Sequence, residues 1–205
     1  MQKWQYLLVH QRLPKKQELE DFRSQIFSEM NLPEPIIESI KNSPKNAHPM
    51  SILRTEVSHL AEFDPDGNEF SPDANLRRAT RLIAKVPTIV ATLYRSRLNR
   101  STPEPKKEFD FAKNFLYMFK GEEPDDNETR VIHRFMILHA DHGFNASTFA
   151  ARVTASTNSD IYSAVTSAIG TLKGPLHGGA TEKVMDMLDD INLEEEVEEY
   201  IDGLL

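Results

Sequence analysis

Apolar side chains recur every three or four residues along most of this sequence. Two series with this spacing are Leu19, Phe22, Ile26, Met30 and Ile161, Val165, Ala168, Leu172. Such spacing places the apolar side chains on one face of a helix that packs on a core. No segment combines strict apolar–polar alternation with flanking hairpin turns. The pattern predicts an all-α fold, with helices at 15–30, 75–100, 126–142, 160–172 and 179–191.

The length of 205 residues is typical of one domain. Polar loops are expected at 64–73 and 101–107, and both are too short to link two domains. The run 86–94 is rich in β-branched residues, yet it lies inside a long helical pattern. We therefore expect a buried helix that continues through Pro87, and we interpret residues 1–205 as a single helical domain.

The composition excludes several classes of protein. The formal net charge is −8, which argues against a nucleic-acid or anionic-membrane partner. The lack of cysteine excludes disulfides and thiolate metal sites. The sequence shows no signal peptide and no apolar run near the roughly 18 residues that span a bilayer. We expect a cytoplasmic protein with no membrane partner.

Glycine and histidine gather in one short segment. Four of the 8 glycines lie between Gly170 and Gly179, around the sequence LKGPLHGGA. Because glycine costs up to about 1 kcal/mol in a helix interior, this segment predicts a sharp break followed by a new helix. His177 would lie just before that helix N-terminus, whose partial positive charge disfavours an imidazolium. A neutral His177 can donate a hydrogen bond to a carbonyl or enolate oxygen, or it can be a structural residue of a glycine-rich turn.

A second cluster lies at 137–153. His139 and His142 are three residues apart, so on a helix they would share a face. The cluster lacks the HExxH pattern of a zinc site, and we predict no metal here. Packing histidines, or binding of an anionic or carbonyl-bearing ligand, are the interpretations left open. Asn145 and Ser147 follow closely and can orient imidazole rings, whereas Ser147 lacks the GxSxG elbow of a nucleophile.

Other basic residues are expected to have no chemical role. Because the net charge is −8, a helix rich in arginine is expected to be solvated or to face a dimer partner. The arginines concerned are Arg77, Arg78, Arg81, Arg95, Arg97 and Arg100. Four histidines lie apart from one another and are interpreted as surface or core residues: His10, His48, His59 and His133.

Longer motifs resemble a known family. The segments HADHxxNASTFAARVxAST (139–157) and AIGTLKGPLHGGA (168–180) closely resemble the core of citrate synthases, in the same order and at the same spacing. HPMSILRTEVSHL (48–60) and RLIAKVPTIVATLYR (81–95) fit as well. The resemblance covers about Tyr6 to Leu205. Its detail is closest to the bacterial and archaeal citrate synthases, with the 2-methylcitrate synthases as near relatives.

This resemblance implies an all-helical homodimer, of which this chain is the central part of the large domain without the small domain. It implies an acyltransferase that condenses acetyl-CoA, as substrate, with oxaloacetate to citrate, using no metal or further cofactor. His177 matches the histidine that stabilises the enolate of acetyl-CoA, His142 a histidine that binds oxaloacetate, and Ser147 the hydroxyl that orients the catalytic histidine. Asn145 and His139 match neighbours that bind substrate in the same cleft.

The sequence departs from the family pattern at two positions and in its extent. Gly143 stands where the family usually has glutamate, and Thr181 where it usually has asparagine. The family's aspartate base and its carboxylate-binding arginines lie beyond the matched segment, and we expect the fold to be incomplete at both ends. Since the first step needs a base, we expect the chain alone to form no citrate. The alternative is a catalytically inactive dimerisation or regulatory module, or a gene fragment.

The resemblance also predicts a geometry. His177 and His142 should face one cleft although they are 35 positions apart. The Ser147 hydroxyl should lie within hydrogen-bond distance of a His177 ring nitrogen. That contact would set the tautomer and leave the other nitrogen to donate to a thioester oxygen.

Overall fold

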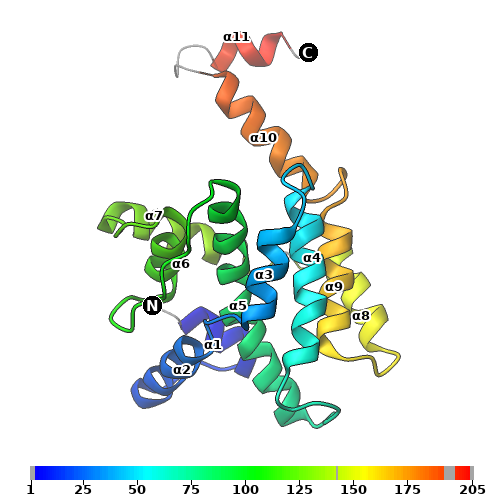
Figure 1. The fold of residues 1–205 in the computed structure, drawn as a ribbon. Helices are drawn as coiled ribbons and strands as arrows, with labels where there is room; N and C mark the ends of the chain where they lie inside the picture. Colours follow the sequence, from blue (N-terminus) through cyan, green and yellow to red (C-terminus); the bar gives the residue numbers. More distant parts are fainter. Residues whose placement is uncertain (1–2, 142, 192–196, 204–205) are drawn as a thin grey trace.

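The secondary structure of the computed structural model is helical. The structure describes residues 3–141, 143–191 and 197–203, and no strand occurs among them. In chain order the elements are α1 (Lys3–His10), α2 (Lys16–Ser28), α3 (Glu34–Asn42), α4 (Pro49–His59), the 3₁₀ helix η1 (Leu60–Phe63), α5 (Pro72–Arg97), α6 (Phe111–Lys120), α7 (Asp126–Leu138), α8 (Ala146–Ala155), α9 (Ile161–Leu172), α10 (Gly179–Asp190) and α11 (Val197–Asp202). The predicted all-α fold class is confirmed (Figure 1).

Four of the five predicted helices agree with the structure to within a few residues, and α5 runs through Pro87. The exception is α7, which is predicted to reach residue 142 but ends at Leu138. His139 is its C-cap, and Gly143 has a φ of 69°. A left-handed residue does not continue an α-helix, so the apolar pattern overestimates this helix by one turn.

A continuous apolar core lies between α3, α4, α5 and α9. Its buried members are Ile36, Ile40, Ile52, Val57, Leu60, Leu82, Ile89, Leu93, Tyr162 and Ile169. α9 lies beside α4 on one side and α8 on the other (Figure 1). A second cluster joins α1 and α2 to α5 and α6. Because α5 contributes to both clusters, it connects the two halves of the body.

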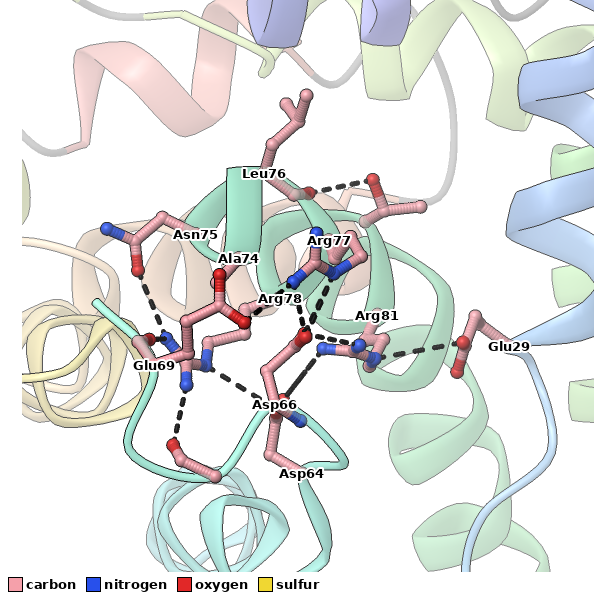
Figure 2. Close-up of polar contacts among 12 residues, drawn as sticks. Glu29, Asp64, Asp66, Glu69, Ala74, Asn75, Leu76, Arg77, Arg78 and Arg81 are labelled. Carbon is pink, nitrogen blue, oxygen red and sulfur yellow. Dashed lines mark hydrogen bonds and ion pairs between the residues drawn. The ribbon is translucent and has the colours of Figure 1, made fainter. Parts of the chain in front are cut away.

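Three of the six arginines are buried, so the prediction of a solvated or dimer-facing helix is wrong for Arg78, Arg81 and Arg95. Arg78 and Arg81 are 2% and 7% exposed. Figure 2 shows both side chains turned toward the loop that precedes α5. Arg81 lies 3.0 Å from Oδ2 of Asp64 and 2.6 Å from Oδ2 of Asp66, and Arg78 donates to the carbonyl of Gly67 at 2.6 Å. The neutralising carboxylates come from another segment, which local spacing on α5 does not reveal.

This charged network joins several elements. The hydroxyl of Tyr162, at the start of α9, donates a hydrogen bond to Asp64. Burial and that hydrogen bond raise the pKa of Tyr162. Glu29, just after α2, lies 3.7 Å from Nε of Arg81 and 2.9 Å from Nζ of Lys85. These contacts fix the positions of the 64–69 loop, α5, α9 and the end of α2 relative to one another.

α10 leaves the body of the molecule. It projects away from the other helices, with α11 beyond it (Figure 1). Val184, Met185 and Leu188 on α10 are about half exposed, and no described helix packs along its length. The single-domain interpretation of residues 1–205 stays a prediction. None of the helices in the described ranges combines the length and apolarity that crossing a bilayer requires.

Candidate functional site

The α8–α9 hairpin brings two predicted site residues to one end of the molecule. The two helices follow each other in the chain and pack side by side (Figure 1). Ser147 lies in the first turn of α8, and His177 lies five residues after α9 ends at Leu172. In a helical hairpin the start of one helix lies beside the end of the other. Residues that are far apart in sequence therefore meet here.

The turn between α9 and α10 is closed by short backbone hydrogen bonds. The N–H of Gly178 donates to the carbonyl of Leu172 at 2.8 Å, and the N–H of His177 donates to the carbonyl of Gly174 at 2.9 Å. A Cβ atom at position 178 would lie 2.3 Å from the Leu172 carbonyl oxygen, so a side chain cannot be placed there without moving the turn. The sharp break and the new helix predicted from LKGPLHGGA are confirmed.

Ser147 and His177 are in direct hydrogen-bond contact. Oγ of Ser147 meets Nε2 of His177, and both residues are partly buried. The predicted contact is therefore present. When the hydroxyl donates, Nε2 is the acceptor and the ring proton belongs to Nδ1, a tautomer assigned from the contact. Such a ring keeps one N–H donor for an oxygen atom of a ligand.

Asn145 and His139 hold local backbone positions. The side chain of Asn145 caps α8 by accepting from the N–H of Thr148 at 2.9 Å. Nδ1 of His139 lies 2.9 Å from the carbonyl oxygen of Phe135, and the two rings stack with centroids 4.0 Å apart. The exposed His139 thus contacts the helix that it follows, and its contacts with Phe135 do not involve His177. Asn145, by contrast, precedes Ser147 by two residues at the start of α8.

The structure contradicts the prediction that α7 carries His139, because the helix ends at Leu138. His142 lies outside the described residues, so the common cleft of His142 and His177 stays a prediction. In the described ranges, no three His, Asp or Glu side chains converge in a way that could hold a metal ion.

Both departures from the family pattern have defined backbone positions. Gly143 has a φ of 69°, and its N–H donates to Oδ1 of Asp141 at 2.9 Å. A residue with a Cβ is strained in this left-handed region, so glycine suits the local backbone better than glutamate. Thr181 is exposed in the first turn of α10, where its N–H donates to the carbonyl of Gly178 at 3.0 Å.

His48 links the start of α4 to α10, a role that its isolated position in the sequence does not reveal. Nδ1 of His48 accepts from the N–H of Met50 at 3.2 Å and caps α4. Its Nε2 lies 3.7 Å from Oε1 of Glu182 on α10. A capping residue followed by proline marks a helix start, so the cap has a signal in the sequence. The approach to Glu182 depends on where α10 lies and has no such signal.

Comparison with known proteins decides the family. A family model described as "Citrate synthase, C-terminal domain" matches residues 1–205. The chain belongs to the citrate synthase family. It is 50% identical over 197 residues to citrate synthase 2 of Bacillus subtilis, a match that covers 96% of this chain and 53% of that protein. It is 44% identical over 185 residues to the 2-methylcitrate synthase of Mycobacterium tuberculosis, covering 90% of this chain and 47% of that protein.

A solved citrate synthase has the same arrangement of helices. The structure resembles citrate synthase from Thermoplasma acidophilum in its ternary complex with carboxymethyl coenzyme A and oxaloacetate, with a TM-score of 0.89 and 29% identity. That match covers 98% of this chain and 53% of the other. This citrate synthase-family chain therefore spans about half the length of the curated relatives it matches.

Proposed function

We propose that this citrate synthase-family chain supplies the histidine that stabilises the enolate of acetyl-CoA during its condensation with oxaloacetate to citrate. The observation that carries the proposal is the contact between Oγ of Ser147 and Nε2 of His177, at the junction of α9 and α10. The chain spans about half the length of its relatives. In this proposal, the aspartate base and the carboxylate-binding arginines belong to the other half.

His177 acts in this mechanism as a neutral hydrogen-bond donor. The Ser147 hydroxyl donates to Nε2, which assigns the ring proton to Nδ1. When a base removes a proton from the acetyl methyl group, negative charge develops on the thioester oxygen, and Nδ1–H stabilises it. The enolate carbon then attacks the keto carbon of oxaloacetate, and water hydrolyses the citryl thioester to release CoA.

The oxaloacetate side of the proposed site takes His142, His139 and Asn145. Asn145 is supported by its place at the start of α8, two residues before Ser147. His142 is assigned both to oxaloacetate binding and, with His177 and Ser147, to catalysis. The ternary complex of the Thermoplasma enzyme contains a coenzyme A analogue and oxaloacetate. We assign the same two ligand classes to the complete protein, with acetyl-CoA as substrate and no metal or further cofactor.

The exposed apolar face of α8 supports a homodimer. α8 buries none of its residues, and Phe149 and Val153 are 56% and 52% exposed. Phe144, just before the helix, is 60% exposed. Covering such a face in an obligate dimer would bury well over about 1,000 Å². Analytical ultracentrifugation should show a dimer, and a monomer at every protein concentration would contradict this proposal.

We further propose that the complete protein is located in the cytoplasm.

The proposed catalytic role is tested by transplanting the chain into a relative. A chimaera in which this chain replaces the matching half of Bacillus subtilis citrate synthase 2 is expected to release CoA from acetyl-CoA in the presence of oxaloacetate. His177→Ala in the chimaera should lower kcat by about 10²–10³-fold, the usual cost of losing an oxyanion donor. Ser147→Ala should lower it less, because the ring remains. Gln25→Ala, on the exposed side of α2, is the matched control.

Three other outcomes have defined meanings. Turnover by the 205-residue chain alone, abolished by His177→Ala, would place a base inside this chain and contradict the proposal. A chimaera that folds and dimerises without turnover would favour the inactive dimerisation or regulatory module. Faster turnover of propionyl-CoA than of acetyl-CoA would identify the 2-methylcitrate synthase alternative, which the similarity to the Mycobacterium relative supports.

A further inference from the structure

A cavity of about 380 Å³ lies between α1, α5, α6 and α7, and His139, just after α7, is part of its wall. Its wall is mainly apolar and aromatic, with Trp4 and Leu8 from α1, Phe111 from α6 and Phe135 from α7. The volume falls at the lower end of the range of binding pockets, about 300–1,000 Å³, which are lined mainly by apolar and aromatic side chains. The cavity is therefore suited to apolar groups.

The wall contains a polar side chain, that of Gln5, which lacks a hydrogen-bond partner in the part of the chain that the structure describes. Gln5 is 2% exposed, and among the described residues no donor or acceptor lies within hydrogen-bond distance of its Oε1 or Nε2. Gln5 also lines the cavity. A buried amide without hydrogen bonds is costly, and nearly all such groups in native proteins are paired. The amide of Gln5 thus indicates an occupant that offers both an acceptor and a donor.

The apolar surface continues beyond the cavity. Leu8 and Phe135, which line it, are 50% and 51% exposed. Leu138, three residues after Phe135 on α7, is 77% exposed. Residues three apart on a helix are neighbours, so the apolar surface extends along α7. A small molecule held in the cavity would leave this surface in water, whereas a polypeptide segment would cover it.

We propose that this cavity is the docking site of an extended polypeptide segment that places an apolar side chain in the cavity and pairs one backbone peptide group with the amide of Gln5. A peptide group offers one N–H donor and one C=O acceptor, which matches the C=O and NH₂ of a glutamine side chain. The segment is extended or in a turn at that point, because backbone groups inside a helix are already paired. The relatives are about twice as long as this chain and contain polypeptide that can serve as the occupant.

The chain carries its own reporter for this site. It contains 1 tryptophan, Trp4, which lines the cavity. The probes are short overlapping synthetic peptides that tile the part of Bacillus subtilis citrate synthase 2 outside the matched region. One peptide, or two adjacent ones, should shift the emission of Trp4 to shorter wavelength in a saturable titration, and scrambled versions should not. The readout involves no turnover, so its outcome is separate from that of the proposed function.

A substitution at Gln5 tests the polar half of the proposal. Gln5→Leu removes the unpaired buried amide, so the free chain should unfold at a higher temperature. The same change removes the peptide-pairing group, so the peptide should bind about tenfold more weakly, the equivalent of one hydrogen-bond pair. Gln25→Leu, on the exposed side of α2, should change neither quantity. Circular dichroism establishes that each variant is folded before titration.

Several results would overturn the proposal. No change in Trp4 emission with any peptide would remove the polypeptide occupant. A change in emission with protein concentration, in the absence of peptide, would assign the surface to a second copy of the chain. A Gln5→Leu variant that binds the peptide equally well would show that the amide of Gln5 has no role in docking. A variant less stable than the parent would show that this amide is already paired in the free chain, which removes the basis of the proposal.

Discussion

The two ends of α9 are held in opposite ways. At its start, Tyr162 is 4% exposed and donates to Asp64, whose side chain is 2% exposed and contacts Arg78 and Arg81. At its other end the chain enters a turn in which Leu176 is 99% exposed and the hydrogen bonds are mostly local backbone ones. One end is anchored by buried charge and the other carries the candidate site. Residues from other segments can approach the candidate site at the less buried end, while the buried charges at the other end keep α9 in place.

The largest loss of stability is expected when the buried charge network at the start of α9 is disrupted. Asp64→Asn leaves Arg78 and Arg81 without their shared carboxylate in a buried setting, and removing one partner of such a group costs about 3–5 kcal/mol. Urea unfolding should show this loss. Glu123→Gln removes the partner of Lys113 in a surface pair and should change stability little. A loss below about 1 kcal/mol in Asp64→Asn would mean that the network is a weak anchor.

At the end of α9 that carries the candidate site, stability should depend more on the backbone conformation of the turn than on the burial of side chains. Gly178→Ala forces the turn to move because its Cβ would meet the carbonyl of Leu172, and we expect a loss of about 1–3 kcal/mol. NMR of the His177 ring should show altered contact with Ser147. Gly170→Ala is the matched control, since its Cβ would make an ordinary contact with Arg54. Alanine in the interior of α9 should stabilise the chain by about 0.5–1 kcal/mol.

Acid should weaken the anchored end before it affects the turn. The hydrogen bond from Arg77, together with that from Arg81, lowers the pKa of Asp66 to about 2. The carboxyl of the unfolded chain titrates at about 4, so the interaction stabilises the fold above that pH and is lost as pH falls from about 4 to about 2. Asp66→Asn should reduce the pH dependence of unfolding in this window.

The pair of Arg12 and Glu18 serves as the control for the acid experiment. Hydrogen bonds from Arg12 and from the backbone of Lys15 lower the pKa of Glu18 to about 2 as well. Glu18→Gln should therefore remove a part of the same pH dependence without loosening the start of α9. Equal protection of the Tyr162 backbone in Asp66→Asn and Glu18→Gln, measured by hydrogen exchange at pH 3, would contradict a special role for the Asp66 pairs.

The smallest effect on stability is expected for Ser147→Ala. The variant loses one partly buried hydrogen bond, worth about 0.5–1.5 kcal/mol. Its main effect should be on the His177 ring, whose ¹⁵N shifts should change from one dominant Nδ1–H tautomer to a mixture. Ser147→Thr retains the hydroxyl and should preserve the parent tautomer. Identical ring shifts in Ser147→Ala and the parent would show that the hydroxyl does not set the tautomer.

The local sequence pattern was sufficient to predict several features of this protein. The three-to-four spacing of apolar residues predicts helices because it depends on the chain's own periodicity. The glycines of LKGPLHGGA predict the turn before α10, since their conformational cost in a helix is a local property. The contact of Ser147 with His177 was predicted from the resemblance of two motifs to the citrate synthase family. Neither residue indicates this contact by itself.

Tertiary structure alone decided which side of each helix is buried and which charges are paired. Arg78 and Arg81 look like solvated residues in sequence, yet a loop that folds back onto α5 encloses and neutralises them. His48 reaches Glu182 only because α10 starts near the first turn of α4. The spacing of apolar residues describes one helix at a time. Burial and charge pairing depend on which distant segment of the chain packs against that helix. That information is absent from local spacing and is present in the packed chain.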